Sequence, residues 1–382
     1  MQVARASIFA RLGGIGHMCR IAAARYGESR VTVALRLFNL YRLRGFRPGE
    51  ALALGLADPG ISTEALGACF PKPEMQALQD RLNPTELIPL TEDKGIFDAY
   101  CVARGIPVPT QFAILGRAAG QRPSVPTLTS CDEWLREVVP RLPATFITKP
   151  ALGVYGEGVN AWTRMDSGFC DQAQRLFSAR GIFDLCGADS KYDRFLVQER
   201  LTNHPSLLAL TGAATLQTVR VATLVDAEGE ARVLYAVWKL VVGAGDGVTD
   251  NFHFGLSGNM FANVALADGA SGAALGPAPD GIGLRSLSIH PVTGASLEGF
   301  RLPDWDAVIE LALRAARLFL PLRTIGWDIG MTPRGPVIVE ANRWWDPPNG
   351  ALLGPAAPGE GPHDLILSAS LLRAAVQKAD RP

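Results

Sequence analysis

The chain has 382 residues, with 37 lysines and arginines balancing 37 acidic side chains, so its formal net charge is zero. Apolar residues make up 48% and charged residues 19%, a globular composition that excludes a disordered or fibrous protein. A chain of this length suits two or three packed subdomains. Because the molecule has no net charge, we expect no binding of DNA or RNA.

Cysteine spacing and hydropathy bear on the cellular compartment. The six cysteines are scattered, with no CxxC pair and no cysteine and histidine cluster at zinc spacing, which indicates a reducing compartment. No apolar run is long enough to span a bilayer, and the N-terminus lacks the apolar core and cleavage site of a signal peptide. We therefore expect a cytoplasmic protein.

The first 90 residues have a helical pattern, interrupted by turn signals at residues 47–49 and 58–60. Residues 1–50 hold nine arginines but only two acids, Glu28 and Glu50, and apolar residues recur between them at helical spacing. Basic amphipathic helices of this kind can lie on an anionic membrane surface or bind an acidic partner. The alternative is a helical subdomain whose arginines are solvated.

An alternation of helices and strands follows. Residues 91–94 resemble a capping box and predict a helix through Cys101, and residues 131–139 and 304–320 predict two more helices. Strands are expected at residues 111–115, 145–149, 159–163, 195–199, 218–225 and 231–240, with two more within residues 324–340. The pattern predicts an α/β protein behind an N-terminal helical part.

The first candidate site residues follow the strand at 145–149. Lys149 ends that strand, and three glycines, Gly153, Gly156 and Gly158, come directly after it. Glycines let backbone N–H groups approach phosphate oxygens closely, and a lysine adds a positive charge for the same oxygens. The spacing fits neither a P-loop nor a Rossmann fingerprint, so a phosphate-covering loop and an ordinary glycine-rich hairpin both remain open.

The last two strands carry candidate metal ligands. Glu340 and Asn342 are two residues apart, so strand alternation puts them on one face. If residues 333–335 form a three-residue loop, Asp328 falls opposite Glu340. Mg²⁺ takes few protein oxygens and completes its shell with water and phosphate, which suits this set. The alternative is that the carboxylates face solvent on a plain hairpin.

Two cations lie on otherwise apolar strands, Arg220 after residues 218–219 and Lys239 near the end of residues 235–239. Such charges need partners, and these are either a transferring phosphate or a structural ion pair. Residues 250–251 with nearby glycines predict only a polar turn.

Taken in order, these pieces resemble the ATP-grasp superfamily and most closely its sugar-transfer-associated family. The resemblance runs over roughly residues 90 to 350. It is carried by Asp93 and Lys94, Lys149 and Pro150 with their glycines, and residues 197–201, 218–220, 250–252, 326–328 and 340–342. It implies an ATP-grasp fold in which residues 91–194 form the small and residues 195–382 the large α/β subdomain around ATP, behind the helical subdomain that the pattern of residues 1–90 predicts.

The resemblance also implies roles for individual residues. Phosphates would be bound by Lys94 and Lys149 under the loop of Gly153, Gly156 and Gly158, and adenine by a hinge strand with Gln198, Glu199 and Leu201. Mg²⁺ would be held by Asp328, Glu340 and Asn342, and the transferring group by Arg220 and Lys239. Relatives often place an acid for the ribose after the hinge, whereas this chain has Asn203, His204 and Pro205. His204 either takes the ribose contact or caps a turn.

The chemistry implied is ATP-dependent activation of a carboxylate as an acyl phosphate, which a nucleophile then attacks. A kinase-like phosphotransferase for a sugar or polyol hydroxyl, and a non-catalytic nucleotide-binding protein in glycan assembly, are the alternatives. The acceptor would be a small molecule or linked to a glycan, in polysaccharide or secondary-metabolite biosynthesis.

Overall fold

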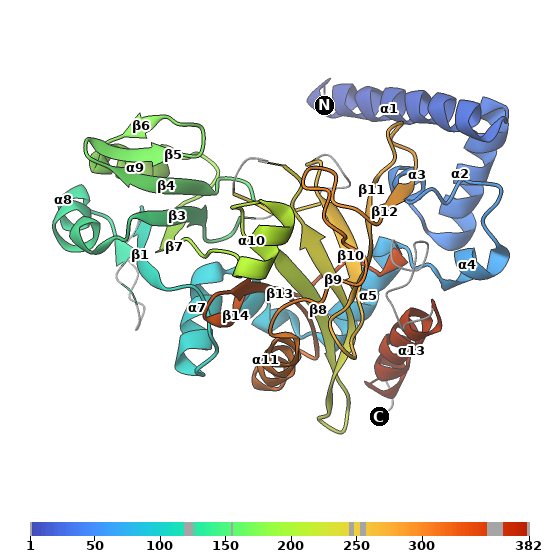
Figure 1. The fold of residues 1–382 in the computed structure, drawn as a ribbon. Helices are drawn as coiled ribbons and strands as arrows, with labels where there is room; N and C mark the ends of the chain where they lie inside the picture. Colours follow the sequence, from blue (N-terminus) through green and yellow to red (C-terminus); the bar gives the residue numbers. More distant parts are fainter. Residues whose placement is uncertain are drawn as a thin grey trace.

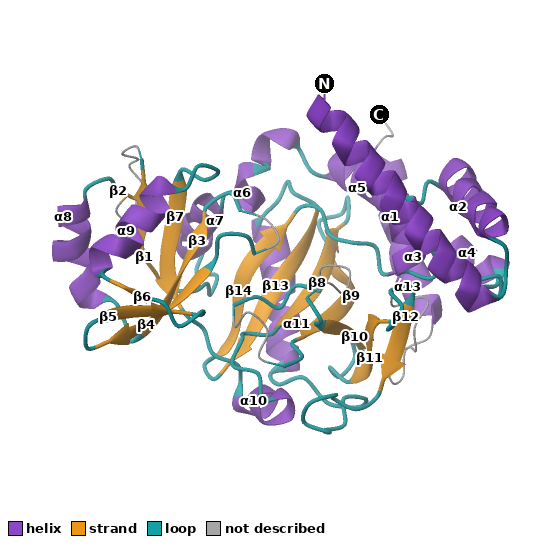
Figure 2. Cartoon of the chain, turned by 90° about the horizontal axis from the view of Figure 1, so that it is seen from above, coloured by secondary structure: helices purple, strands orange, loops and turns teal. Residues whose placement is uncertain are grey.

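The computed structural model describes residues 2–379 apart from residues 118–124, 126, 154–155, 244–247, 253–256 and 350–361. Figures 1 and 2 show a first sheet at one end, a second sheet in the middle and the N-terminal helices at the other end. Among the described helices, none is both long and apolar enough to cross a membrane. The α/β prediction is confirmed.

The N-terminal helices form a layer with its own small core. The layer consists of α1 (Gln2–Tyr26), α2 (Arg30–Arg44), α3 (Pro48–Ala53) and α4 (Thr63–Ala68). Ser29 caps α2 by accepting a hydrogen bond from the Thr32 N–H at 3.1 Å, and Gly45 ends it in the left-handed conformation. The layer docks on the second sheet, where Arg25 and Asp280 form an ion pair at 2.7 Å.

Three helices lead from this layer into the rest of the chain. They are α5 (Lys72–Leu82), α6 (Pro89–Glu92) and α7 (Lys94–Ala103), with a 3-10 turn at Thr85–Leu87 before α6. The expected capping box is wrong in detail, because residues 91 and 92 belong to α6 and Asp93 is the cap of α7. Phe97 and Cys101 of α7 join the core of the second sheet, whereas the first residue of the helix, Lys94, donates a backbone hydrogen bond to the Ala151 carbonyl after β3 at 2.9 Å.

The first sheet has the strand order β2-β1-β7-β3-β4-β5-β6, and only the β1–β2 pair is parallel. Its strands are β1 (Gln111–Gly116), β2 (Thr127–Leu128), β3 (Thr145–Pro150), β4 (Asn160–Met165), β5 (Gly168–Asp171), β6 (Leu176–Phe177) and β7 (Arg194–Glu199). One face is covered by α8 (Cys131–Glu133), its continuation through residue 141 and α9 (Ala179–Ala188). Lys149 and Gln198 alternate away from that covered face.

The second sheet is antiparallel throughout, in the order β12-β11-β10-β9-β8-β13-β14. Its strands are β8 (Thr218–Val225), β9 (Ala231–Leu240), β10 (Met260–Val264), β11 (Ser271–Pro277), β12 (Leu284–Leu287), β13 (Thr324–Thr332) and β14 (Gly335–Asn342). On one face α11 (Trp305–Leu318) packs over the main hydrophobic core. On the other, α5 and α13 (Pro362–Ala379) cover one end of β8 and β9, which leaves the other end to polar side chains.

Candidate functional site

Lys94, the first residue of α7, brings together three segments that are distant in the sequence. The Asp93 carboxylate fixes the start of this helix by accepting hydrogen bonds from two backbone N–H groups of its first turn, at 3.0 and 3.1 Å. Lys94 Nζ donates to the Gly153 carbonyl at 2.5 Å and forms an ion pair with Glu340 Oε1 at 2.9 Å. A lysine, the glycine loop and a candidate metal ligand therefore meet at one point.

Lys149 lies close to this point at the end of β3, and its side chain is buried. Burial and the positive charge of Lys94 lower the pKa of Lys149 to about 8. Asp98 is also buried, and burial raises its pKa to about 6 against the opposing charge of Lys149. Its Oδ1 has no hydrogen-bond partner among the described residues. Asp98 is not among the site residues expected from the sequence, although its spacing from Lys94 puts both on one face of α7.

The glycine loop approaches the second sheet closely. Gly156 has a φ of +75°, and a Cβ there would lie 2.5 Å from Thr249 Cγ2, so the position requires glycine. Glu157 holds the same loop to the first sheet, because its Oε2 accepts a hydrogen bond from the Tyr192 hydroxyl at 3.0 Å and pairs with Lys191. Residues 154 and 155 of the loop lie outside the described residues.

The hairpin of β13 and β14 aligns the candidate metal ligands by a different route from the one expected. The turn contains two residues, Pro333 and Arg334, not the three expected. This turn alone would place Asp328 opposite Val339. A β-bulge adds one residue to β14 and shifts the register, so that Asp328 pairs with Glu340. The expected pairing is confirmed, and the expected loop is wrong.

The same bulge decides which way the side chains of β14 point. Ile338 and Ala341 both belong to the core beneath α11, although regular alternation would put residues three apart on opposite faces. Glu340 and Asn342 therefore lie on the opposite, partly exposed face. Without the bulge, Glu340 would share the apolar face of Ile338.

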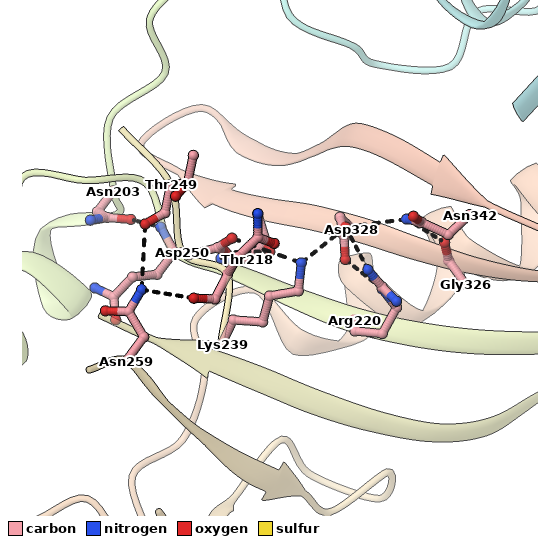
Figure 3. Close-up of polar contacts among 12 residues, drawn as sticks. Asn203, Thr218, Arg220, Lys239, Thr249, Asp250, Asn259, Gly326, Asp328 and Asn342 are labelled. Atoms are coloured by element: carbon pink, nitrogen blue, oxygen red, sulfur yellow. Dashed lines mark hydrogen bonds and ion pairs between the residues drawn. The ribbon is translucent and has the colours of Figure 1, made fainter. Parts of the chain in front are cut away.

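Asp328 is the centre of a charged network on this face of the second sheet (Figure 3). Arg220 binds it with two hydrogen bonds, Nε to Oδ1 at 2.6 Å and Nη2 to Oδ2 at 2.8 Å. Lys239 Nζ lies 3.0 Å and Asn342 Nδ2 3.2 Å from Oδ2. Arg220 and Lys239 thus both form a structural ion pair with Asp328, which was one of the two partners expected for them. Their contact with a transferring phosphate stays a prediction.

The network keeps Asp328 ionised. Burial alone would raise its pKa, but the charges of Arg220 and Lys239 outweigh burial and hold that pKa well below its ordinary value. The network continues to Asp250, which accepts hydrogen bonds from the backbone N–H and the hydroxyl of Thr218 at 2.7 and 2.5 Å and lies 3.8 Å from Lys239 Nζ. The sequence had indicated only a turn there.

The hinge residues lie at the end of β7 and just after it. Gln198 is buried, and its Oε1 has no hydrogen-bond partner among the described residues. Glu199 forms an ion pair with Arg334 of the second sheet, and Leu201 is half-buried. His204 caps α10 (Pro205–Thr211), because its Nδ1 accepts a hydrogen bond from the backbone N–H of the second helical residue at 3.2 Å. This is the capping role expected as one alternative for His204, and its ribose contact stays a prediction.

The donor set fits a nucleotide with a hard metal ion. Two neighbouring lysines, Lys94 and Lys149, suit phosphate oxygens, and the unpaired Gln198 Oε1 suits an amino group of a base. Within the described residues no three histidine, cysteine or acidic side chains cluster around a metal position. The carboxylates of Asp328 and Glu340 with the Asn342 amide still fit Mg²⁺, which binds few protein oxygens alongside substrate phosphates.

The chain matches a known protein family over most of its length. Residues 74–348, from α5 to just beyond β14, match the model of the family described as sugar-transfer-associated ATP-grasp. No curated protein matches the chain.

Similar solved structures are remote. The chain resembles an ADP complex of N5-carboxyaminoimidazole ribonucleotide synthetase, with a TM-score of 0.39, 13% identity and coverage of 73% of this chain and 52% of that one. A biotin carboxylase complex from Campylobacter jejuni has a TM-score of 0.44 and 11% identity, with coverage of 79% of this chain and 49% of that one. D-alanine–D-alanine ligase from Bacillus anthracis has a TM-score of 0.40 and 12% identity, with coverage of 76% of this chain and 68% of that one. The chain thus spans about half the length of the first two. Since the family match covers most of the chain, the protein belongs to the sugar-transfer-associated ATP-grasp family and has the ATP-grasp fold.

Proposed function

We propose that the protein is a cytoplasmic, Mg²⁺- and ATP-dependent ligase that activates a carboxylate as an acyl phosphate for attack by an amine or another nucleophile. The observation that carries this proposal is the contact of Lys94 with both the Gly153 carbonyl and Glu340. It joins a phosphate-binding lysine, the glycine loop and a metal-binding carboxylate at one point, as phosphoryl transfer requires.

Each residue has a role in this proposal. Lys94 and Lys149 hold the phosphates, the glycine loop covers them, and the hinge at Gln198 to Leu201 binds adenine. Asp328, Glu340 and Asn342 would hold Mg²⁺, which supplies charge neutralisation at the phosphates when bound. Arg220 and Lys239 hold the Asp328 carboxylate ionised and, with phosphate present, stabilise negative charge that develops on the transferring group.

The proposed reaction has two displacement steps and needs no covalent enzyme intermediate. A carboxylate oxygen of the acceptor attacks the γ-phosphorus, and ADP leaves with the electrons of the broken P–O bond. The nucleophile then attacks the acyl carbon, phosphate leaves, and the nucleophile loses its proton. The family description, which refers to sugar transfer, supports an acceptor that is linked to a glycan.

Two measurements test the proposal. Mg-ATP at a hundredfold excess over Kd should stabilise the fold by roughly 2.7 kcal/mol, and EDTA should remove most of this gain. Incubation with ATP, candidate carboxylates and hydroxylamine should then yield a hydroxamate. ADP release without hydroxamate, together with a phosphorylated sugar or polyol, would identify a kinase instead. Binding without any ADP release would identify a non-catalytic nucleotide-binding protein.

A further inference from the structure

The helix α2 is apolar on two opposite sides, and its neighbours cover only one of them. The buried side packs into the core of the N-terminal layer through Val33, Leu37 and Leu40. The other side exposes a line of large apolar side chains, Val31 at 68%, Leu35 at 58% and Phe38 at 57%. Their spacing of four and three residues puts them on one stripe of the helix.

The apolar part of this stripe covers about the first two turns of α2. Arg42 continues the line by one more helical turn, while Tyr41 and Leu43 flank it with exposed fractions of 53% and 79%. Scattered single apolar residues are ordinary on protein surfaces, but a contiguous apolar stripe marks an interaction site. The core of the N-terminal layer accounts only for the opposite side of the helix.

The segment that carries the stripe is rich in positive charge. Residues 1–50 hold nine of the 37 basic residues of the chain but only two of its 37 acidic residues. One of these acids, Glu28, is neutralised by Arg36 at 2.7 Å. The exposed Arg30, Arg42 and Arg47 form no salt bridge within the described part of the chain.

The position of α2 leaves this surface accessible. In both Figures 1 and 2, α2 lies at the end of the molecule away from the first sheet. The family match begins at residue 74, so the whole layer of α1 to α4 lies outside the residues that match the family model.

We propose that the exposed stripe of α2 docks on an anionic lipid bilayer surface, with its apolar side chains in the headgroup boundary and its arginines on lipid phosphates. A helix with apolar and basic side chains on one exposed side lies in the plane of such an interface, and long arginine side chains keep their charged ends at the headgroups. Charge selects this partner over a second copy of the chain. In a two-fold contact centred on the stripe, the Arg42 end of one α2 helix would lie beside the Arg30 end of the other, so like charges would meet.

The test is sedimentation of the full-length protein with phosphatidylcholine vesicles, with and without phosphatidylserine, at low and high salt. Binding should require the anionic lipid and weaken as salt rises. The triple variant Arg30→Gln, Arg42→Gln, Arg47→Gln should lower the partition coefficient about a hundredfold, since each cation near the surface contributes roughly a factor of five. The double variant Leu35→Gln, Phe38→Gln should also lower the partition coefficient, although it leaves the charge of the protein unchanged.

A matched control comes from the first sheet. Met165 and Leu176 are 51% and 58% exposed, close to the values for Leu35 and Phe38, so the variant Met165→Gln, Leu176→Gln should bind vesicles like the native protein. Protein that stays in the supernatant with anionic vesicles at low salt overturns the proposal, as does sedimentation unaffected by the α2 substitutions. A dimer seen by light scattering that the Leu35 and Phe38 substitutions dissolve, without vesicle binding, would identify a second copy as the occupant and also overturn it.

Discussion

Replacing Asp328 with asparagine removes one negative charge from the centre of the charged network while keeping the shape of the side chain. The residue is 4% exposed, and its carboxylate accepts two hydrogen bonds from Arg220, one from Lys239 and one from Asn342. The guanidinium of Arg220 stays charged at any accessible pH, so the substitution leaves it buried and unpaired. We expect Asp328→Asn to lower the free energy of unfolding by about 3–5 kcal/mol.

Urea unfolding of the free protein in EDTA measures this loss without a contribution from metal or nucleotide. The double variant Arg220→Met, Asp328→Asn should be more stable than Asp328→Asn alone by about 2 kcal/mol, because it also removes the unpaired cation. Asp132→Asn is the control, since Asp132 pairs with Arg180 at 3.4 Å on the surface and its loss should cost at most about 1 kcal/mol.

The dependence on pH has a definite sign. The pKa of Asp328 is lower in the folded than in the unfolded protein, so its contribution is fully present above the unfolded value of about 3.9 and is lost as pH falls toward the folded value. The difference between native protein and Asp328→Asn should therefore shrink only in acid. A loss below about 1 kcal/mol for Asp328→Asn at neutral pH would refute a buried network.

Three further predictions concern the nucleotide site. The pKa of Lys149 is lowered to about 8, so the lysine loses its positive charge as pH rises above 8. The Mg-ATP dissociation constant, measured by calorimetry, should therefore rise about tenfold per pH unit above 8. Lys149→Ala should bind Mg-ATP weakly at every pH, and its dissociation constant should lack this dependence on pH. Glu340→Gln should retain nucleotide but lose ADP release, and wild-type turnover would exclude Glu340 as a metal ligand. In the native protein, an ATP analogue with Mg²⁺ should slow hydrogen exchange of the loop amides. Gly156→Ala, which clashes with Thr249, should abolish that slowing, and unchanged protection would mean that the loop does not close there.

The sequence by itself determined the elements whose signals are local. The helix expected at residues 304–320 is α11 (Trp305–Leu318), whose buried Val308, Leu311 and Ala315 recur at helical spacing. The strand that ends at Lys149 was equally clear, because a β-branched and aromatic run meets Pro150 and glycines. The order of these pieces was enough to indicate the family.

Strands β10, β11 and β12 were not expected from the sequence, because small residues dominate β11 and only pairing with neighbouring strands stabilises it. The face of the second sheet on which Glu340 and Asn342 lie was also decided by the tertiary structure. Their strand carries a bulge that only the partner strand β13 makes visible, and a shift of one residue reverses the face of every side chain.

The ion-pair partners of the charged residues could not be predicted from the sequence for a related reason. It showed that Arg220 and Lys239 need counter-charges, but not that both pair with Asp328, since Arg220 and Asp328 are separated by 108 residues. Pairing at that separation is decided by strand order, which places β8 between β9 and β13 and so brings both cations beside one carboxylate. Local propensity fixes the elements, whereas the charges of the site are assigned only when the sheet assembles.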